Sequence, residues 1–262
     1  MRLGRWTRWI GKVRQAAVDW LDLDGRHNQI ERLTDLDSHP RPVLLLQGLL
    51  STRRTFKVLE ARLRRDGYGV FSLNLGGLRR VYNTRGIDDL ADFVRAKVER
   101  IYARHPGLGP LTIVGHSKGG LVATYYVKKL GGWRRSRAVV TLGTPFHGTP
   151  RAWLGLPLAP FAPSIPQLLP GSRFLQRLHD GAWPHQVRLT SIWSKRDGLA
   201  PWPSPVLDPH GSTEVRNVEV DCEHLEFLTR KGIYLVIRRE LQASILPARE
   251  PLTVMAGGRT GS

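Results

Sequence analysis

A serine in a tight, glycine-flanked turn is the first feature that could do chemistry. Ser117 lies in Gly115-His-Ser-Lys-Gly119, which matches the pattern G-x-S-x-G. The pattern alone would arise by chance in about one chain in ten of this length. Here, however, an apolar run precedes it and a helical pattern follows, so the serine hydroxyl would stand above a sheet edge at a helix N-terminus. This context favours a nucleophilic serine over a glycine-rich turn without chemistry.

A serine hydroxyl needs a base, and two later residues could supply and orient one. His224 follows the expected strand at 215–220, and Asp197 follows the expected strand at 187–193. Both residues come just past the carboxyl ends of expected parallel strands, where ligand sites of such sheets lie. We expect His224 to take the Ser117 proton and Asp197 to hold the imidazole in the required tautomer.

Neighbouring residues leave alternatives open for the acid and the base. Asp208, Asp221 and Glu223 are nearby carboxylates, and His210 is a second imidazole. Asp208 stands in Asp-Pro-His-Gly, which is typical of an exposed turn. Asp221 and Glu223 lie too close in sequence to the preferred histidine to orient it easily across a site.

Two backbone N–H groups are needed to bind the oxyanion of a tetrahedral intermediate. One expected donor is the N–H of Lys118, directly after the serine. The other is the N–H of Leu49, in the loop Gln47-Gly-Leu-Leu50 that follows the first core strand. The alternative is that Gly48 merely ends a strand.

Alternating strand and helix patterns predict the scaffold that positions these residues. Short apolar runs typical of buried strands alternate with stretches of helical spacing. Such alternation predicts an α/β fold with a mostly parallel sheet covered by helices on both faces. The expected strands cover 42–47, 68–75, 111–114, 138–142, 187–193 and 215–220, and the expected helices cover 52–65, 87–103, 121–130 and 225–241.

An apolar, proline-rich stretch interrupts this alternation at residues 148–185. It is too long for a simple connection and too apolar for a linker, so we expect a small cap that packs over the site. Such a cap would bind an acyl chain by burying apolar area. The candidate substrate-binding residues in it are Trp153, Leu156, Phe161 and Leu168.

Composition sets further limits. The chain has 262 residues, with 40 Lys and Arg against 22 Asp and Glu, a net charge of +18. These values suit one domain and exclude collagen-like and globally disordered chains. The single cysteine, Cys222, excludes an intrachain disulfide and fits a reducing compartment. The charge favours anionic partners, but no nucleic-acid-binding motif is found, so nucleic acid is not an expected partner. Neither a metal nor a cofactor is expected.

Residues 1–40 are expected to form a basic amphipathic helix and a connector. The functional interpretation is a helix over 3–21 that lies on an anionic membrane, and the alternative is a helix packed on its own domain. No apolar stretch is long enough for a transmembrane helix or free enough of charge for a secretory signal. We therefore expect a cytoplasmic protein, peripheral at the inner membrane surface under the first interpretation. The apolar stripe of the expected helix over 3–21 consists of Leu3, Trp6, Ile10, Val13, Ala17, Trp20 and Leu21.

Three blocks of sequence together resemble the α/β-hydrolase superfamily, in particular bacterial lipases and related lipid deacylases. They are Leu-Leu-Gln-Gly-Leu-Leu at 45–50, Val-Gly-His-Ser-Lys-Gly-Gly-Leu at 114–121, and Thr-Leu-Gly-Thr-Pro-Phe-His-Gly-Thr at 141–149. A weaker block at 167–175 is similar to a cap segment of that group. The family usually has His-Gly where this chain has Gln47-Gly48, although an amide can still donate a hydrogen bond there.

The resemblance covers about residues 41–242 and implies an α/β-hydrolase domain, which we place at 41–246 with a cap insertion at about 148–185. The tail over 247–262 ends in Gly-Gly-Arg-Thr-Gly-Ser, and we expect it to be disordered. The resemblance also implies a serine carboxylic-ester hydrolase that acts on a hydrophobic ester or lipid through a Ser-His-Asp triad and an acyl-enzyme. The alternatives are an acyltransferase or thioesterase with the same triad, or a non-catalytic protein that docks on membranes. The resemblance indicates no particular oligomeric state.

Overall fold

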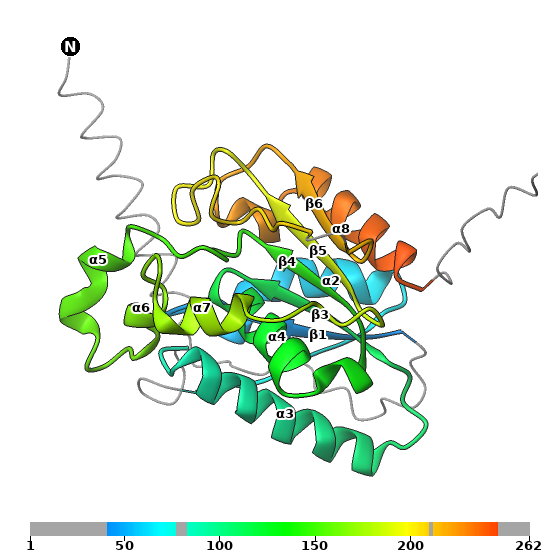
Figure 1. Cartoon of the computed structure of the whole chain (residues 1–262). Coiled ribbons are helices and arrows are strands. Elements are labelled where there is room, and N and C mark those ends of the chain that lie inside the picture. Colours follow the sequence, from blue (N-terminus) through cyan, green and yellow to red (C-terminus); the bar gives the residue numbers. More distant parts are fainter. Residues whose placement is uncertain (1–40, 77–82, 210–211, 246–262) are drawn as a thin grey trace, which may run out of the picture.

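A computed structural model describes residues 41–76, 83–209 and 212–245 of the chain. Six strands in these ranges form one sheet in the order β2-β1-β3-β4-β5-β6, and every neighbouring pair is parallel. Helices cover both faces of the sheet (Figure 1). The expected α/β-hydrolase architecture is thus confirmed. The strands are β1 (Pro42–Leu46), β2 (Gly69–Ser72), β3 (Leu111–His116), β4 (Ser136–Leu142), β5 (Arg188–Trp193) and β6 (Val215–Glu219).

The sheet separates two apolar clusters because successive strand residues face opposite sides. In β1, Leu44 and Leu46 join the cluster under α3 and α4, whereas Val43 and Leu45 join the cluster under α2 and α8. Burial on both faces explains why β1 is an unbroken apolar run in the sequence. The helices are η1 (Arg53–Phe56), α2 (Lys57–Arg65), α3 (Ile87–Arg104), α4 (Lys118–Lys129), η3 (Gly132–Arg134), α5 (Ala152–Gly155), η4 (Leu156–Leu158), α6 (Ser164–Gln167), α7 (Arg173–His179), η5 (Glu226–Leu228) and α8 (Lys231–Ala243).

The stretch at 148–185 contains four short helices, α5, η4, α6 and α7, of which α5 and α6 project at one end of the molecule (Figure 1). The expected helix over 225–241 is divided into η5 and α8, because Arg230 adopts an extended backbone with ψ of 132°. The Arg230 guanidinium forms an ion pair with the Glu226 carboxylate at 3.5 Å, which links the two helices across the break. The expected helix at 3–21 and the tail at 247–262 lie outside the described residues.

In the three described ranges, no helix combines the length and the apolar composition that crossing a bilayer would require.

Candidate active site

Ser117 connects β3 to α4 in a strained conformation. Its φ of 53° and ψ of −125° lie in a region that residues other than glycine rarely adopt. The end of β4 holds it there: its N–H donates to the Leu142 carbonyl at 2.9 Å, and the Thr144 hydroxyl donates to its carbonyl at 3.0 Å. A strained serine between a strand and a helix is the geometry of a nucleophile elbow.

The glycines of the elbow allow two close backbone approaches. A Cβ atom on Gly119 would lie 2.0 Å from the Leu46 carbonyl oxygen, and one on Gly115 would lie 2.5 Å from the Cα atom of Gly120. Neither position could hold a larger residue without moving the backbone. Helix α4 therefore begins directly against the end of β1, and the loop after β1 is brought to the serine.

The structure brings Asp197 and His224 into direct contact. The Asp197 Oδ2 atom lies 2.7 Å from the His224 Nδ1 atom, and both side chains are buried. The other carboxylate oxygen accepts the backbone N–H groups of Leu199 and Ala200 at 2.8 and 2.9 Å. A carboxylate fixed in this way keeps the imidazole proton on Nδ1 and leaves Nε2 as the basic atom.

The alternative acids lie elsewhere. Asp221 and Glu223 are exposed and approach the Arg196 guanidinium at 3.2 and 3.7 Å. Asp208 lines a different cavity. His210, the alternative base, lies outside the described residues.

Ser117, His224 and Leu49 line one cavity of about 340 Å³ between the sheet and the cap. Most of its lining is apolar, and Arg151 is the only Lys, Arg, Asp or Glu side chain among the described lining residues. Its cap side is formed by Thr149, Arg151, Ala152, Gly155, Leu158, Ile165 and Leu168.

Of the four expected cap residues, the structure places one, Leu168, in this cavity. Trp153 and Phe161 are 60% and 66% exposed, and Leu156 packs against the core cluster under α3 and α4. Helix α5 is only four residues long, so its residues point in widely different directions. The methyl group of Ala152 and the backbone of Gly155 line the cavity instead.

Of the two expected oxyanion donors, Leu49 lines this cavity and Lys118 directly follows Ser117. Neither the Leu49 N–H nor the Lys118 N–H donates to another described residue. The next residue in the loop, Leu50, has a φ of 55°, and its N–H donates to the Asn83 carbonyl at 3.0 Å. The Asn83 side-chain amide in turn donates to the Gln47 carbonyl at 2.7 Å. Asn83 thus holds the loop from both ends, a role that no pattern in the sequence indicates.

His116 is a second residue that the sequence does not single out. Its ring centre lies 4.6 Å from that of His224, and its Nε2–H donates to the His224 carbonyl at 3.0 Å. Burial, and to a lesser extent the charge of His224, lowers the pKa of His116 to about 3. A neutral His116 therefore supports the backbone of the candidate base.

Neither an activated cysteine nor a cluster of metal-ligating side chains is found in the described ranges. Cys222 is buried, and burial raises its pKa to about 12, so its thiol stays protonated at neutral pH. No group of three or more His, Cys, Asp or Glu side chains could hold a metal ion in the described ranges.

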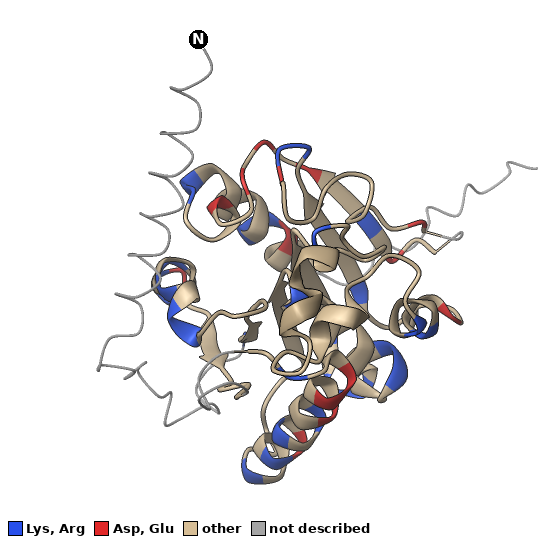
Figure 2. Cartoon of the chain, turned by 90° about the vertical axis from the view of Figure 1, so that its left-hand side faces the viewer, with Lys and Arg blue, Asp and Glu red and all other residues tan. Residues whose placement is uncertain are grey.

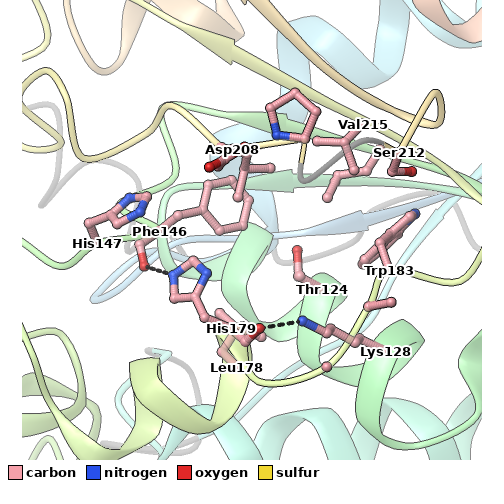
Figure 3. Close-up of a pocket in the computed structure, with 15 residues that line it drawn as sticks. Thr124, Lys128, Phe146, His147, Leu178, His179, Trp183, Asp208, Ser212 and Val215 are labelled. Carbon is pink, nitrogen blue, oxygen red and sulfur yellow. Dashed lines mark hydrogen bonds between the residues drawn. The ribbon is translucent and has the colours of Figure 1, made fainter.

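Figure 3 shows a second cavity, of about 430 Å³. Neither Ser117 nor His224 is among its described lining residues. Lys128 at the end of α4, His179 and Trp183 line it, together with Val215 at the start of β6. In this cavity the Lys128 ammonium donates to the His179 carbonyl at 2.9 Å.

Comparisons with known proteins agree with this fold. A family model described as "Serine aminopeptidase, S33" matches residues 38–199, which contain β1 to β5, the elbow and Asp197. A search of curated proteins finds no match.

Several solved structures share the fold at low sequence identity. The mature form of the Bacillus licheniformis lipase BlEst2 is 16% identical with a TM-score of 0.61, over 80% of this chain and 96% of that one. Aspergillus fumigatus lipase B is 18% identical with a TM-score of 0.67, over 82% of this chain and 55% of that one. A Paleococcus ferrophilus monoacylglycerol lipase is 17% identical with a TM-score of 0.52, over 78% and 93%. With the six-stranded parallel sheet and the family match, the chain belongs to the α/β-hydrolase superfamily, in the family described as serine aminopeptidase, S33.

Proposed function

We propose that this chain is a serine hydrolase that cleaves carboxylic esters of hydrophobic acyl groups, with Ser117 as nucleophile, His224 as base and Asp197 as the acid that orients it. One observation carries the proposal: a strained serine and a histidine bound to a buried carboxylate line the same apolar cavity. A glycine-rich turn without chemistry would need neither the strain nor the buried Asp–His pair.

The reaction follows from these groups. His224 Nε2 takes the Ser117 hydroxyl proton as Oγ attacks the ester carbonyl, and the carbonyl oxygen becomes an anion that the Leu49 and Lys118 N–H groups bind. The intermediate collapses, the alcohol leaves with the proton from His224, and an acyl-serine remains. Water then attacks the acyl-serine and gives its proton to His224. The second tetrahedral intermediate collapses, and His224 returns the proton to the departing Ser117 oxygen as the carboxylic acid is released.

The cavity supports an ester rather than an aminopeptide as the substrate. A free peptide N-terminus carries a positive charge, which binds best to a carboxylate. The described residues that line the cavity include no Asp or Glu. Among their Lys, Arg, Asp and Glu side chains the only one is Arg151, which is positively charged. Acyl transfer or thioester cleavage would use the same serine and differ only in the group that accepts or releases the acyl chain.

Labelling with a fluorophosphonate tests the nucleophile without knowledge of the substrate. We expect the wild-type chain to be labelled and Ser117→Ala to lose both labelling and esterase turnover. Ser212→Ala is a matched control, because Ser212 lines the second cavity and should leave labelling unchanged. Labelling of Ser117→Ala at the wild-type rate would contradict the assignment.

A panel of p-nitrophenyl esters of increasing chain length tests the hydrophobic part of the proposal. Each methylene buried in the apolar cavity stabilises the complex by about 0.8 kcal/mol, or about fourfold in kcat/KM. We expect butyrate and longer esters to exceed acetate by this increment until the cavity is full. The highest kcat/KM on acetate would contradict a hydrophobic acyl site.

A further inference from the structure

The Lys118 side chain is buried at the start of α4, on the residue that follows the proposed nucleophile. Its ammonium donates to the carbonyls of Asn83 and Arg85 at 3.1 and 2.9 Å, and to the Ser164 hydroxyl at 3.1 Å. All three acceptors are uncharged, and no ion pair joins Lys118 to a described carboxylate. Burial, and then the charge of Arg85, lowers the pKa of Lys118 well below its usual range.

A buried ammonium without a carboxylate partner is costly, so its hydrogen bonds decide whether it is tolerated. The Asn83 carbonyl that accepts from Lys118 also accepts the Leu50 N–H at 3.0 Å. The Asn83 amide donates to the Gln47 carbonyl at 2.7 Å. Lys118 therefore holds the residue that holds both ends of the loop at 47–50, and this loop contains Leu49, the other proposed oxyanion donor.

The third acceptor belongs to the cap. Ser164 begins α6, and while its hydroxyl accepts from Lys118, it donates to the Thr84 carbonyl at 3.4 Å. The following residue, Ile165, and Leu168 both line the catalytic cavity. One ammonium thus joins the start of α4, the segment before α3 and the cap helix that covers the acyl site.

We propose that the Lys118 ammonium is a positioning residue that fixes the geometry of the oxyanion hole. Its backbone N–H supplies one donor, and its side chain holds, through Asn83, the loop that supplies the other. This inference rests on the proposed ester hydrolysis. Because the oxyanion forms only after the attack, the loss of this support should weaken the transition state more than substrate binding.

Lys118→Met tests the inference, because methionine has a similar length but no donor. Lys128→Met is the matched control: Lys128 lies on the same helix, is half-buried and also donates to a backbone carbonyl, but in the second cavity (Figure 3). With p-nitrophenyl butyrate we expect Lys118→Met to lower kcat about 100-fold, the effect of a lost oxyanion donor. KM should change less than about threefold, and Lys128→Met should match the wild type in both constants.

Inhibitor binding provides a readout that a purely structural role would not change. A trifluoromethyl ketone forms a tetrahedral adduct with the serine, so its affinity should fall in Lys118→Met in proportion to kcat. A kcat equal to that of Lys128→Met, or equal losses in kcat and in the affinity of a ground-state competitor, would overturn the inference.

Ser164→Ala keeps the inference testable if Lys118→Met does not fold. It retains the lysine, removes one acceptor, and should lower kcat several-fold with KM unchanged; an unchanged kcat in this variant would overturn the inference. A wild-type chain with neither turnover nor fluorophosphonate labelling would contradict the proposed function instead, so the two failures are distinct.

Discussion

Asp197 accepts hydrogen bonds on both carboxylate oxygens. Replacing one of these oxygens by an NH2 group, as in Asp197→Asn, should therefore have a large effect on catalysis. In Asp197→Asn the amide would donate to His224 Nδ1 and force the proton onto Nε2, the wrong tautomer for a base. We expect kcat to fall by a factor on the order of 10⁴, measured with p-nitrophenyl butyrate. Asp221→Asn, at an exposed ion pair with Arg196, is the control and should keep full activity. Full activity of Asp197→Asn would assign the acid to another carboxylate.

Gly143 follows β4 and stands directly against the Asp–His pair. Its φ is +53°, and a Cβ atom there would lie 2.6 Å from Asp197 Oδ2 and 3.1 Å from His224 Nδ1. Gly143→Ala should therefore displace the pair and lower kcat more than tenfold, an effect of more than about 1.4 kcal/mol on the barrier.

Gly171→Ala separates this displacement from backbone strain alone. Gly171 also has a positive φ, of +72°, but a Cβ atom there would meet nothing within 4 Å. It should cost about 1–2 kcal/mol of folding free energy and leave kcat unchanged. Thermal melts and p-nitrophenyl butyrate assays of both variants check this, and equal kcat values in the two would contradict the contact.

At the scale of elements, the cap brings one charge to an apolar cavity. The Arg151 guanidinium stands over Gly198, 3.2 Å from where a Cβ atom would be, and it makes no ion pair with a described carboxylate. Exposed leucines at 158, 199 and 225 line the same cavity. We therefore expect Arg151, the one Lys or Arg side chain among the described lining residues, to favour an ester whose alcohol carries an anionic group.

Two butyrate esters that differ only in a carboxylate on the alcohol would test this preference. We expect Arg151→Gln to lower the ratio of kcat/KM for the anionic ester to that for the neutral one by up to about fivefold, which corresponds to about 1 kcal/mol, the upper end for an exposed charge. Arg173→Gln, on α7, is the control. The same ratio in the wild type and in Arg151→Gln would mean that the Arg151 charge does not interact with the substrate.

Patterns that repeat locally predicted the elements well, whereas the tertiary contacts of Asn83, of the Lys118 side chain and of the cap could not be predicted from them. Unbroken apolar runs identified β1 and β3, because strands covered on both faces carry no polar alternation. The elbow and its expected Asp and His partners follow strands and were therefore predictable in position. The role of Asn83 and the side-chain contacts of Lys118 depend on segments distant in sequence, so no local spacing announces them.

In the cap, the lining residues were predicted from residue type alone, and most of these predictions were wrong. Which residues line the cavity depends on the direction in which each side chain points. Trp153 and Phe161 are apolar but exposed, whereas Ala152 and Gly155 line the cavity. A four-residue helix does not complete enough turns for hydrophobic spacing to indicate its buried face.

For the whole molecule, the net charge of +18 is not gathered into one stripe on the side that Figure 2 shows. Helix α3 carries both signs: Asp88, Asp89 and Asp92 lie in its first turns, and the charged residues that follow are mostly basic (Figure 2). The Arg95 guanidinium and the Asp92 carboxylate pair at 2.9 Å. We propose that residues 3–21, outside the described residues, supply binding to anionic membranes. Equal co-sedimentation with anionic vesicles by the full chain and by a deletion of 1–21 would contradict this.

Acid stability is a property of the whole fold that one buried histidine should affect. Burial lowers the pKa of His116 to about 3, against about 6.5 in an unfolded chain. Between these values the unfolded chain binds a proton that the folded chain does not, so the free energy of unfolding must fall as the pH falls. From pH 7 to pH 5 this residue alone should remove about 2 kcal/mol.

Urea unfolding of His116→Gln at both pH values measures this contribution. Glutamine keeps an N–H that can donate to the His224 carbonyl but does not titrate, so this variant should lose about 2 kcal/mol less than the wild type between pH 7 and pH 5. His185→Gln, at an exposed histidine, is the control and should lose as much as the wild type. Each variant lacks one histidine and is otherwise identical to the wild type. A difference between the stability losses of the two variants therefore reports the titration of His116. Equal losses in all three proteins would mean that His116 is already protonated in the folded state at pH 5.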